Sequence, residues 1–221
     1  MVFQRELLFF FVRNLIHLSD MKSSVAAKVR SHVSRLPLGS FIQPSLIDGS
    51  PGAIDAEFSR LAGEGKLLRV RKGLYWKGRV TKFGMVPPDP EVVAIAVGGA
   101  GSGPAGVAAV HRLGLTTQVP GYPRVAVPGR TPSAVPGVRF SERPWSRREF
   151  RLSEEEVAVI EVLRDWPQAV EGSWNDLLES VIRLHKSSAI RPRAIAKDVE
   201  CERHKGLRER WAMLSEEAEF V

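Results

Sequence analysis

The stretch from residue 60 to residue 82 constrains the fold of this chain more than any other. It holds eight basic residues and one acid, Glu64, so it carries a net charge of +7, which equals the formal charge of the whole protein. A helical pattern over residues 50–64 leads into it and ends at Gly65. Residues 65–76 then read GKLLRVRKGLYW, which predicts two short strands joined by a basic turn. The chain therefore places a helix and a basic hairpin next to each other.

The composition and the local surplus of positive charge indicate a protein with one basic binding face. A chain of 221 residues that is 43% hydrophobic is long enough for two domains with a core. Outside residues 60–82 the charges balance, at 24 basic and 24 acidic residues. The pI near 9.9 therefore indicates one face for a polyanion. The single cysteine, Cys201, excludes an intrachain disulfide framework and favours a reducing compartment, so we predict a cytoplasmic protein.

The first twenty residues contain an apolar run, LLFFFV at 7–12, that charged residues bracket closely. It is far shorter than the ~20 apolar residues that a spanning helix needs, and no small-residue cleavage site follows it. We therefore expect no membrane partner and no signal peptide. Two interpretations stay open: an added helix that packs on the body, or an upstream extension 1–20 before a natural start at Met21. The helical pattern that begins just after Met21 favours the second.

Residues 21–80 have the pattern of a winged helix-turn-helix, in which a helix and a basic hairpin meet DNA. The expected helices cover 23–36, 43–48 and 50–64, and the expected strands cover 39–42, 67–70 and 74–76. On the helix over 50–64, the predicted buried stripe is Ile54, Phe58, Leu61 and Ala62. The predicted exposed face is Ala53, Asp55, Glu57, Ser59 and Arg60.

Residues 81–221 are predicted to form the second domain, after a proline-rich connector at 81–90. The part from 81 to 151 mixes short strands with helices, including a helix over 104–113, and the part from 152 to 221 reads as all-helical. Ser153 and Ser173 are placed to cap two of its helices. The predicted fold class is α/β in the sense of mixed α+β, with a small mixed domain and C-terminal helices behind the winged helix.

The residue types around the hairpin suit double-stranded DNA. Lysine and arginine neutralise phosphates, residues of the helix over 50–64 can read base edges, and serines at helix starts can bind phosphate. The alternatives are a solvated charged face and a protein-docking module. The predicted DNA contacts are Ser45, Ser50, Ser59, Arg60, Lys66, Arg69, Arg71 and Lys72.

Other motifs point away from an enzyme. Residues 101–106 match the pattern G-x-G-x-x-G, but the next acid is Glu142, too far on to hold a ribose. Pro104 also removes a backbone N–H that a phosphate would use. The histidines lack metal-ligand spacing, and Cys201 with His204 makes only a two-residue pair. We predict no cofactor, no metal and no catalytic residues.

One further segment, LGLTTQVPGYP at 113–123, reads as a turn that ends a helix. Its side chains Thr116, Thr117 and Gln118 can satisfy buried backbone groups or contact a partner. This segment, the wing segment 60–76 and FGMVPP at 83–88 together resemble the AbiEi-like antitoxin family in order and spacing. The resemblance covers roughly residues 25–141. Trp76 stands where the family more often has tyrosine, and the extension 1–20 is atypical of it.

The resemblance implies a two-part antitoxin. Its N-terminal winged helix would bind and repress the promoter of its own operon, through wing positions Lys66, Arg69, Arg71 and Lys72. Its C-terminal part would neutralise a toxin with a nucleotidyltransferase fold that a neighbouring gene encodes, and a homodimer on the DNA is one possible assembly. Acidic side chains suit a basic toxin. The candidate toxin contacts are Glu154, Glu155, Glu156, Glu161, Trp145, Arg147 and Arg148.

Two rival hypotheses stay open at this point. One is a stand-alone winged-helix transcriptional regulator whose C-terminal domain senses a ligand or a protein, which requires a compact apolar pocket there. The other is an enzyme that uses the glycine loop, which requires space for a nucleotide beside Gly101 and Gly103.

Overall fold

The computed structural model describes residues 24–168 and 170–220. The apolar run 7–12 and the predicted extension 1–20 lie outside the described residues. The fold is mixed α+β, as predicted: the described part forms nine α-helices, one 3-10 helix and three small sheets. It divides into two compact units, and the boundary between Pro88 and Asp89 falls inside the proline-rich connector that the sequence suggested at 81–90.

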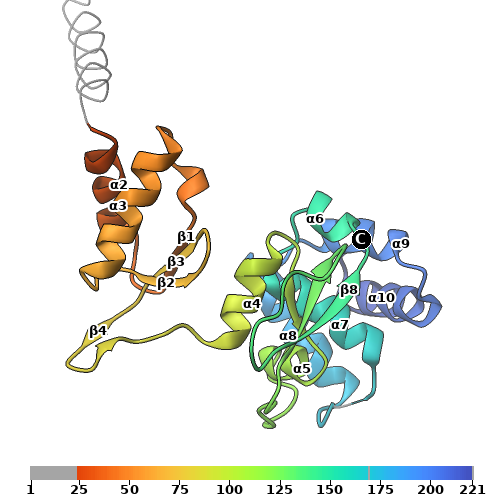
Figure 1. Ribbon diagram of the computed structural model, residues 1–221. Helices are drawn as coiled ribbons and strands as arrows, with labels where there is room; N and C mark the ends of the chain where they lie inside the picture. Colours follow the sequence, from red (N-terminus) through yellow and green to blue (C-terminus); the bar gives the residue numbers. More distant parts are fainter. Residues whose placement is uncertain (1–23, 169, 221) are drawn as a thin grey trace, which may run out of the picture. The chain divides into compact units, whose positions relative to one another are not determined.

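The first unit is a small helical body with a three-stranded sheet and a separate hairpin (Figure 1). The sheet has the order β1-β3-β2 and is antiparallel throughout. The two strands of the hairpin are β4 and β5. In chain order the elements are α2 (Val25–Arg35), β1 (Ser40–Ile42), the 3-10 helix η1 (Pro44–Leu46), α3 (Pro51–Gly63), β2 (Leu68–Arg71), β3 (Leu74–Lys77), β4 (Val80–Thr81) and β5 (Gly84–Met85).

Its core joins α2 and α3 to the sheet. The predicted stripe of α3 is buried at Ile54, Phe58 and Leu61, and the Phe58 ring lies 4.9 Å from the Tyr75 ring of β3. Ser24 caps α2 by accepting a hydrogen bond from the backbone N–H of Ala27. The second predicted helix is shorter than expected and is the single turn η1, because the backbone is already extended at Ile47, which ends the helix after Leu46.

The second unit surrounds a three-stranded sheet of order β6-β7-β8, antiparallel between β6 and β7 and parallel between β7 and β8. Its elements are α4 (Pro90–Gly98), β6 (Gly103–Ala105), α5 (Val107–Arg112), β7 (Arg124–Pro128), β8 (Arg139–Arg143), α6 (Ser146–Glu149), α7 (Glu154–Asp165), α8 (Trp174–Lys186), α9 (Pro192–Cys201) and α10 (Lys205–Glu217).

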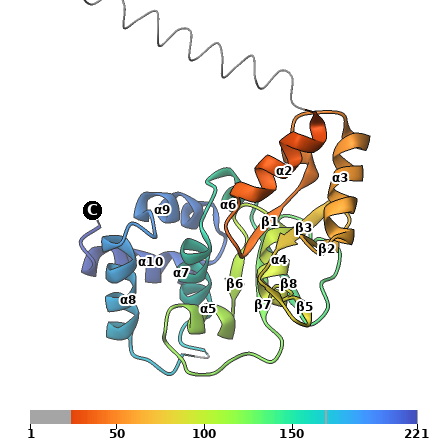
Figure 2. The ribbon, with the colours of Figure 1, turned by 90° about the vertical axis from the view of Figure 1, so that its left-hand side faces the viewer.

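Helix α7 is the centre of this unit. It lies between the sheet and the C-terminal helices (Figure 2), against β6 on one side and α10 on the other. Eight of its residues are buried, from Glu156 to Leu163. Ser153 begins α7 with a capping box to Glu156, and Ser173 begins α8 with one to Asp176. Both predicted caps are therefore confirmed.

The helix expected over 104–113 was wrong in its first half. Residues 103–105 form the buried strand β6 instead, and α5 begins only at Val107. Gly101 has a φ of +80°, and a side chain there would overlap the backbone of Arg147. The glycines are present because the chain turns sharply in a crowded interior, and the turn delivers a strand to the sheet before the helix starts.

None of the helices in residues 24–168 and 170–220 is long and apolar enough to cross a membrane.

Candidate nucleic-acid interface

The basic hairpin that the sequence predicted is formed by β2 and β3. Its turn holds Lys72 and Gly73, and Gly73 has a φ of +75° with open space around it. Glycine is therefore favoured there by the backbone conformation and not by crowding. The strand register shifts between Arg69 and Arg71, and such a bulge changes the direction of the side chains near a tip.

A cleft of about 590 Å³ lies between η1, the exposed side of α3 and this hairpin. It brings together four of the eight predicted DNA contacts, although they are far apart in the sequence: Ser45, Ser59, Arg69 and Lys72. Two acids, Asp48 and Asp55, line the same cleft. The cleft therefore combines cations that attract phosphate with hydroxyl and carboxylate groups that can contact base edges.

The other predicted contacts are placed differently. Ser50 is exposed at the start of α3 but makes no side-chain cap hydrogen bond. Arg60 is engaged by the carboxylates of Glu57 and Glu64, and Lys66 lies 2.9 Å from Glu64. Arg71 is half-buried on β2. Arg60 and Lys66 already have intramolecular partners, so each must exchange an ion pair before it can bind phosphate.

Glu57 was predicted on the exposed face of α3, and this was wrong. Its side chain is only 6% exposed, and it accepts hydrogen bonds from Arg60 and Arg30, the second of which links α3 to α2 at 2.7 Å. Hydrogen bonding from Arg60, with further help from Arg30, lowers the pKa of Glu57 from 4.5 to about 2, against the opposing effect of burial. The helical pattern missed this because a paired carboxylate can occupy a buried position.

We expect the substitution Glu57→Gln to remove part of the acid sensitivity of the first unit. A carboxylate with a lowered folded pKa stabilises the fold above pH 4.5 and loses that contribution as the pH falls toward 2. Urea unfolding should therefore show the variant less stable than wild type at pH 7, with the difference shrinking toward pH 2. Asp48→Asn, at an exposed carboxylate of the same unit, is the control, and an unchanged difference at low pH would contradict the argument.

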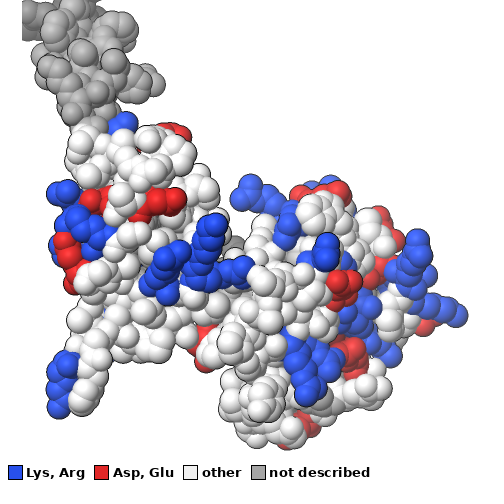
Figure 3. Space-filling view, viewed as in Figure 1, with Lys and Arg blue, Asp and Glu red and all other residues white. Residues whose placement is uncertain are grey.

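The basic residues of the stretch 60–82 divide into two groups. Lys77 serves the fold, because its ammonium donates to the carbonyls of Val33, Ser34 and Leu36 at the end of α2. In the described part of the chain, no acidic side chain forms an ion pair with the exposed residues Arg69, Lys72, Arg79 and Lys82. Figure 3 shows basic side chains in separate groups on the first unit, one of them at the end of the hairpin β4–β5.

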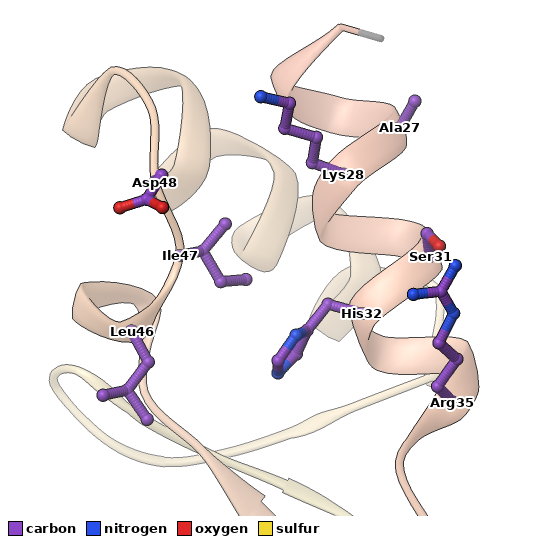
Figure 4. Close-up of a pocket in the computed structure, with 8 residues that line it drawn as sticks. All are labelled: Ala27, Lys28, Ser31, His32, Arg35, Leu46, Ile47 and Asp48. Carbon is purple, nitrogen blue, oxygen red and sulfur yellow. The ribbon is translucent and has the colours of Figure 1, made fainter. Parts of the chain in front are cut away.

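A second hollow, of about 500 Å³, lies between α2 and residues 46–48 (Figure 4). Lys28, His32 and Arg35 of α2 line it at helical spacing, opposite Leu46 and Ile47. Residues spaced by three and four positions lie on one side of a helix. This side of α2 therefore adds positive charge outside the stretch that the sequence singled out.

Three of the seven predicted toxin contacts are fully buried, which excludes them from a surface. Glu156 is the partner of Ser153 in the capping box of α7 and also binds Arg191. Arg147 and Glu161 pair with each other at 2.8 Å in the interior of the second unit. The prediction was wrong for these three, because a run of charges in a sequence does not reveal which members have partners across the fold.

The other four retain exposed atoms. Glu154 and Glu155 both lie near Arg112, at 3.2 and 3.6 Å. Trp145 is 51% exposed, and the Arg148 guanidinium stacks over its ring at 4.5 Å while donating to the carbonyl of Gly98. These side chains are accessible to a partner, but each also makes a contact within the second unit.

The carboxylate of Glu171 accepts hydrogen bonds from Thr116, Thr117 and Gln118. Hydrogen bonds from these three residues lower the pKa of Glu171 to about 2, and Gln118 Nε2 lies 2.9 Å from its carboxylate. The backbone N–H groups of Glu171 and Gly172 donate to the carbonyl of Leu115. The three side chains therefore join two loops, in line with the structural interpretation of the motif.

The glycine loop has no room for a nucleotide. Gly101 and Gly103 are buried against Arg147 and Val157, so these two glycines do not border the space that a nucleotide would need. In the described residues, no group of three or more histidine, cysteine, aspartate or glutamate side chains could hold a metal ion.

Three of the exposed apolar side chains lie outside the sites that the sequence predicted. Phe83 is 89% exposed, and Val119 and Tyr122 are 77% and 70% exposed. All three lie in short segments rich in glycine or proline, where no buried strand or helix calls for a large apolar residue. A large apolar residue in such a turn is the signal that can find them.

Residues 28–126 of the chain match the model of a family of unknown function, DUF6088. No curated protein matches the chain. The matched range contains all three segments on which the resemblance to AbiEi-like antitoxins rests, and it spans parts of both units. The matched family carries no function, so that resemblance stays a prediction.

Proposed function

We propose that the first unit is a winged helix that binds operator DNA, with α3 toward the major groove and the β2–β3 hairpin as the wing. The observation that carries this proposal is the cleft between η1, α3 and the wing, where Arg69 and Lys72 have no acidic partner among the described residues. The order of α2, β1, η1, α3, β2 and β3, with β3 in the middle of the sheet, supports it.

The distribution of charge supports the same proposal. Residues 24–88 carry eleven basic and four acidic side chains, a net charge of +7, whereas residues 89–220 carry eighteen basic and nineteen acidic ones. A surplus confined to one unit attracts a polyanion to that unit. The exposed side of α3 is also made of small residues, such as Gly52, Ala56 and Ser59, which allow the helix to approach a groove closely.

We further propose that the chain is the antitoxin of a toxin–antitoxin pair. The second unit neutralises a nucleotidyltransferase-like toxin, and the first represses the shared operon. This part rests on the resemblance of segments 60–76, 83–88 and 113–120 to AbiEi-like antitoxins. The near-neutral second unit, with accessible Trp145, Val119 and Tyr122, supports a protein partner there.

The stand-alone regulator is the second candidate, and the cavity beside α5 bears on it. This cavity holds about 250 Å³ between Ala105, Pro120, Tyr122 and Arg124. Ligand pockets typically hold roughly 300–1,000 Å³, so this one is small for a sensed ligand. The small size of this cavity favours a protein over a small ligand as the partner of the second unit.

The DNA part is tested by mobility shift with duplexes that tile the region upstream of the gene, in a series of salt concentrations. We expect binding whose logarithm falls linearly with the logarithm of salt concentration, by roughly 0.9 for each phosphate contact. Absence of binding at low salt to every duplex would overturn it.

The antitoxin part is tested separately by co-expression with each neighbouring gene. Growth rescue together with co-purification of the two products supports a directly binding antitoxin. Rescue without a complex points to neutralisation at a distance. If no neighbour is toxic, the regulator replaces the antitoxin.

A further inference from the structure

The hairpin formed by β4 and β5 ends in an aromatic side chain that is almost fully exposed to solvent. Lys82 and Phe83 form its tip, and Phe83 is 89% exposed. The Lys82 ammonium lies 4.9 Å from the centre of the Phe83 ring. A phenylalanine that is almost wholly in water at the end of a hairpin contributes little to the core, so its place is explained better by a partner than by folding.

The hairpin is held in place and is not a loose loop. Thr81 Oγ1 donates to the carbonyl of Gly84 and accepts from the backbone N–H of Phe83, which closes the tip. Trp76 Nε1 donates to the carbonyl of Val86 at 3.0 Å and so ties the hairpin to β3. The wing and the hairpin therefore share one strand as their support, and the tip needs little ordering when it binds.

The charge around the tip identifies the chemistry of the partner. The chain has no acidic residue from Gly65 to Pro88, and seven of these residues are basic. Lys82 lies beside Phe83 at the tip, and Arg79 lies at the base of the hairpin, where its carbonyl accepts a hydrogen bond from the backbone N–H of Val86. Both side chains are exposed, with no acidic partner in the described part of the chain. An aromatic side chain on a hairpin that carries two such cations suits a stacked, polyanionic surface.

We propose that the hairpin 80–85 is a second DNA-contacting element, in which Phe83 enters the minor groove and wedges into a base step. Arg79 and Lys82 bind the flanking phosphates. Apolar wedges of this kind unstack a step and bend the duplex. The proposal rests on the proposed DNA-binding function of the first unit and adds a bend and a contact that the wing does not provide.

The wing tip and the tip of the β4–β5 hairpin are close enough along the chain to contact one duplex together. The wing tip precedes β3 and the hairpin follows it, so the eight residues from Leu74 to Thr81 separate them. Extended chain spans roughly 3.3 Å per residue, or about 26 Å here. This is less than one turn of B-DNA, about 34 Å, so neighbouring grooves of the same site are within reach.

The test compares Phe83→Ala and Phe83→Leu with wild type on the duplex that the wild-type protein binds best. Bending is read from energy transfer between dyes on the two duplex ends, and affinity from titration. We expect Phe83→Ala to lose the bend and about tenfold in affinity. Its salt dependence should stay unchanged, because no charge is removed. Phe83→Leu keeps an apolar wedge and should retain part of the bend.

Val80→Ala is the matched control, because Val80 is 63% exposed on the same hairpin but away from the tip, and it should bend DNA like wild type. A bound but straight wild-type complex, or full bending by Phe83→Ala, would overturn the wedge. Loss of toxin co-purification by Phe83→Ala with unchanged DNA bending would assign the tip to a protein instead. Absence of any wild-type DNA binding would overturn the proposed function itself, and the wedge with it.

Discussion

Replacement of Arg147 by alanine is expected to destabilise the second unit by about 3–5 kcal/mol. Arg147 is fully buried. It lies 2.8 Å from Glu161, 2.9 Å from Glu202 and 3.5 Å from Asp198. Its removal leaves a cavity and buried carboxylates with fewer cations, and both effects are costly.

The surrounding charges explain why this one side chain matters so much. Burial raises the pKa of Glu161, but Arg147, Arg143 and Arg164 outweigh that effect and hold the pKa below its usual range. Burial instead raises the pKa of Asp198, against the opposing effects of its hydrogen bond from Ser146 and of Arg147. The buried acids therefore depend on a fixed set of arginines, and α6, α7 and α9 are joined through them.

Urea unfolding followed by tryptophan fluorescence measures the effect, since four of the five tryptophans lie in the second unit. Arg193→Ala, at an exposed arginine of α9, is the control and should stay within about 0.5 kcal/mol of wild type. If Arg147→Ala does not fold, Arg147→Met keeps much of the volume and is measured in its place. A loss below about 1 kcal/mol in either variant would contradict the structural role of this pair network.

The double substitution Arg69→Ala and Lys72→Ala is expected to weaken DNA binding by roughly ten- to a hundredfold and to lower the salt slope by about 2. Both side chains line the cleft beside α3 without acidic partners in the described residues. They are thus free to neutralise phosphates without first giving up an ion pair.

Mobility shifts at several salt concentrations check both parts of this expectation. The control is Arg193→Ala with Lys197→Ala, which removes the same charge from exposed positions of α9 and should leave binding almost unchanged. Wild-type affinity and salt slope in the Arg69 and Lys72 variant would show that the wing does not contact DNA.

Local features of the sequence were sufficient for most elements of the fold. The apolar stripe of α3, the caps at Ser24, Ser153 and Ser173, and the turn at Gly73 each depend on neighbours within a few residues. Such signals are visible in a linear pattern because a helix cap or a tight turn is a local interaction. The mixed α+β class followed from them.

The charges were the part that the sequence alone could not resolve. Glu57, Arg147 and Glu161 look like surface residues in a linear pattern, yet each has a partner far along the chain, at 27, 14 and 18 positions respectively. Burial of a charge is tolerated only when a counter-charge meets it, and only the tertiary structure decides which charges meet. The linear pattern was enough to predict most of the helices, the turns and where the net charge lies along the chain. The tertiary structure decided which of those charges are consumed inside the fold and which, such as Arg69, Lys72 and Lys82, remain exposed for a partner.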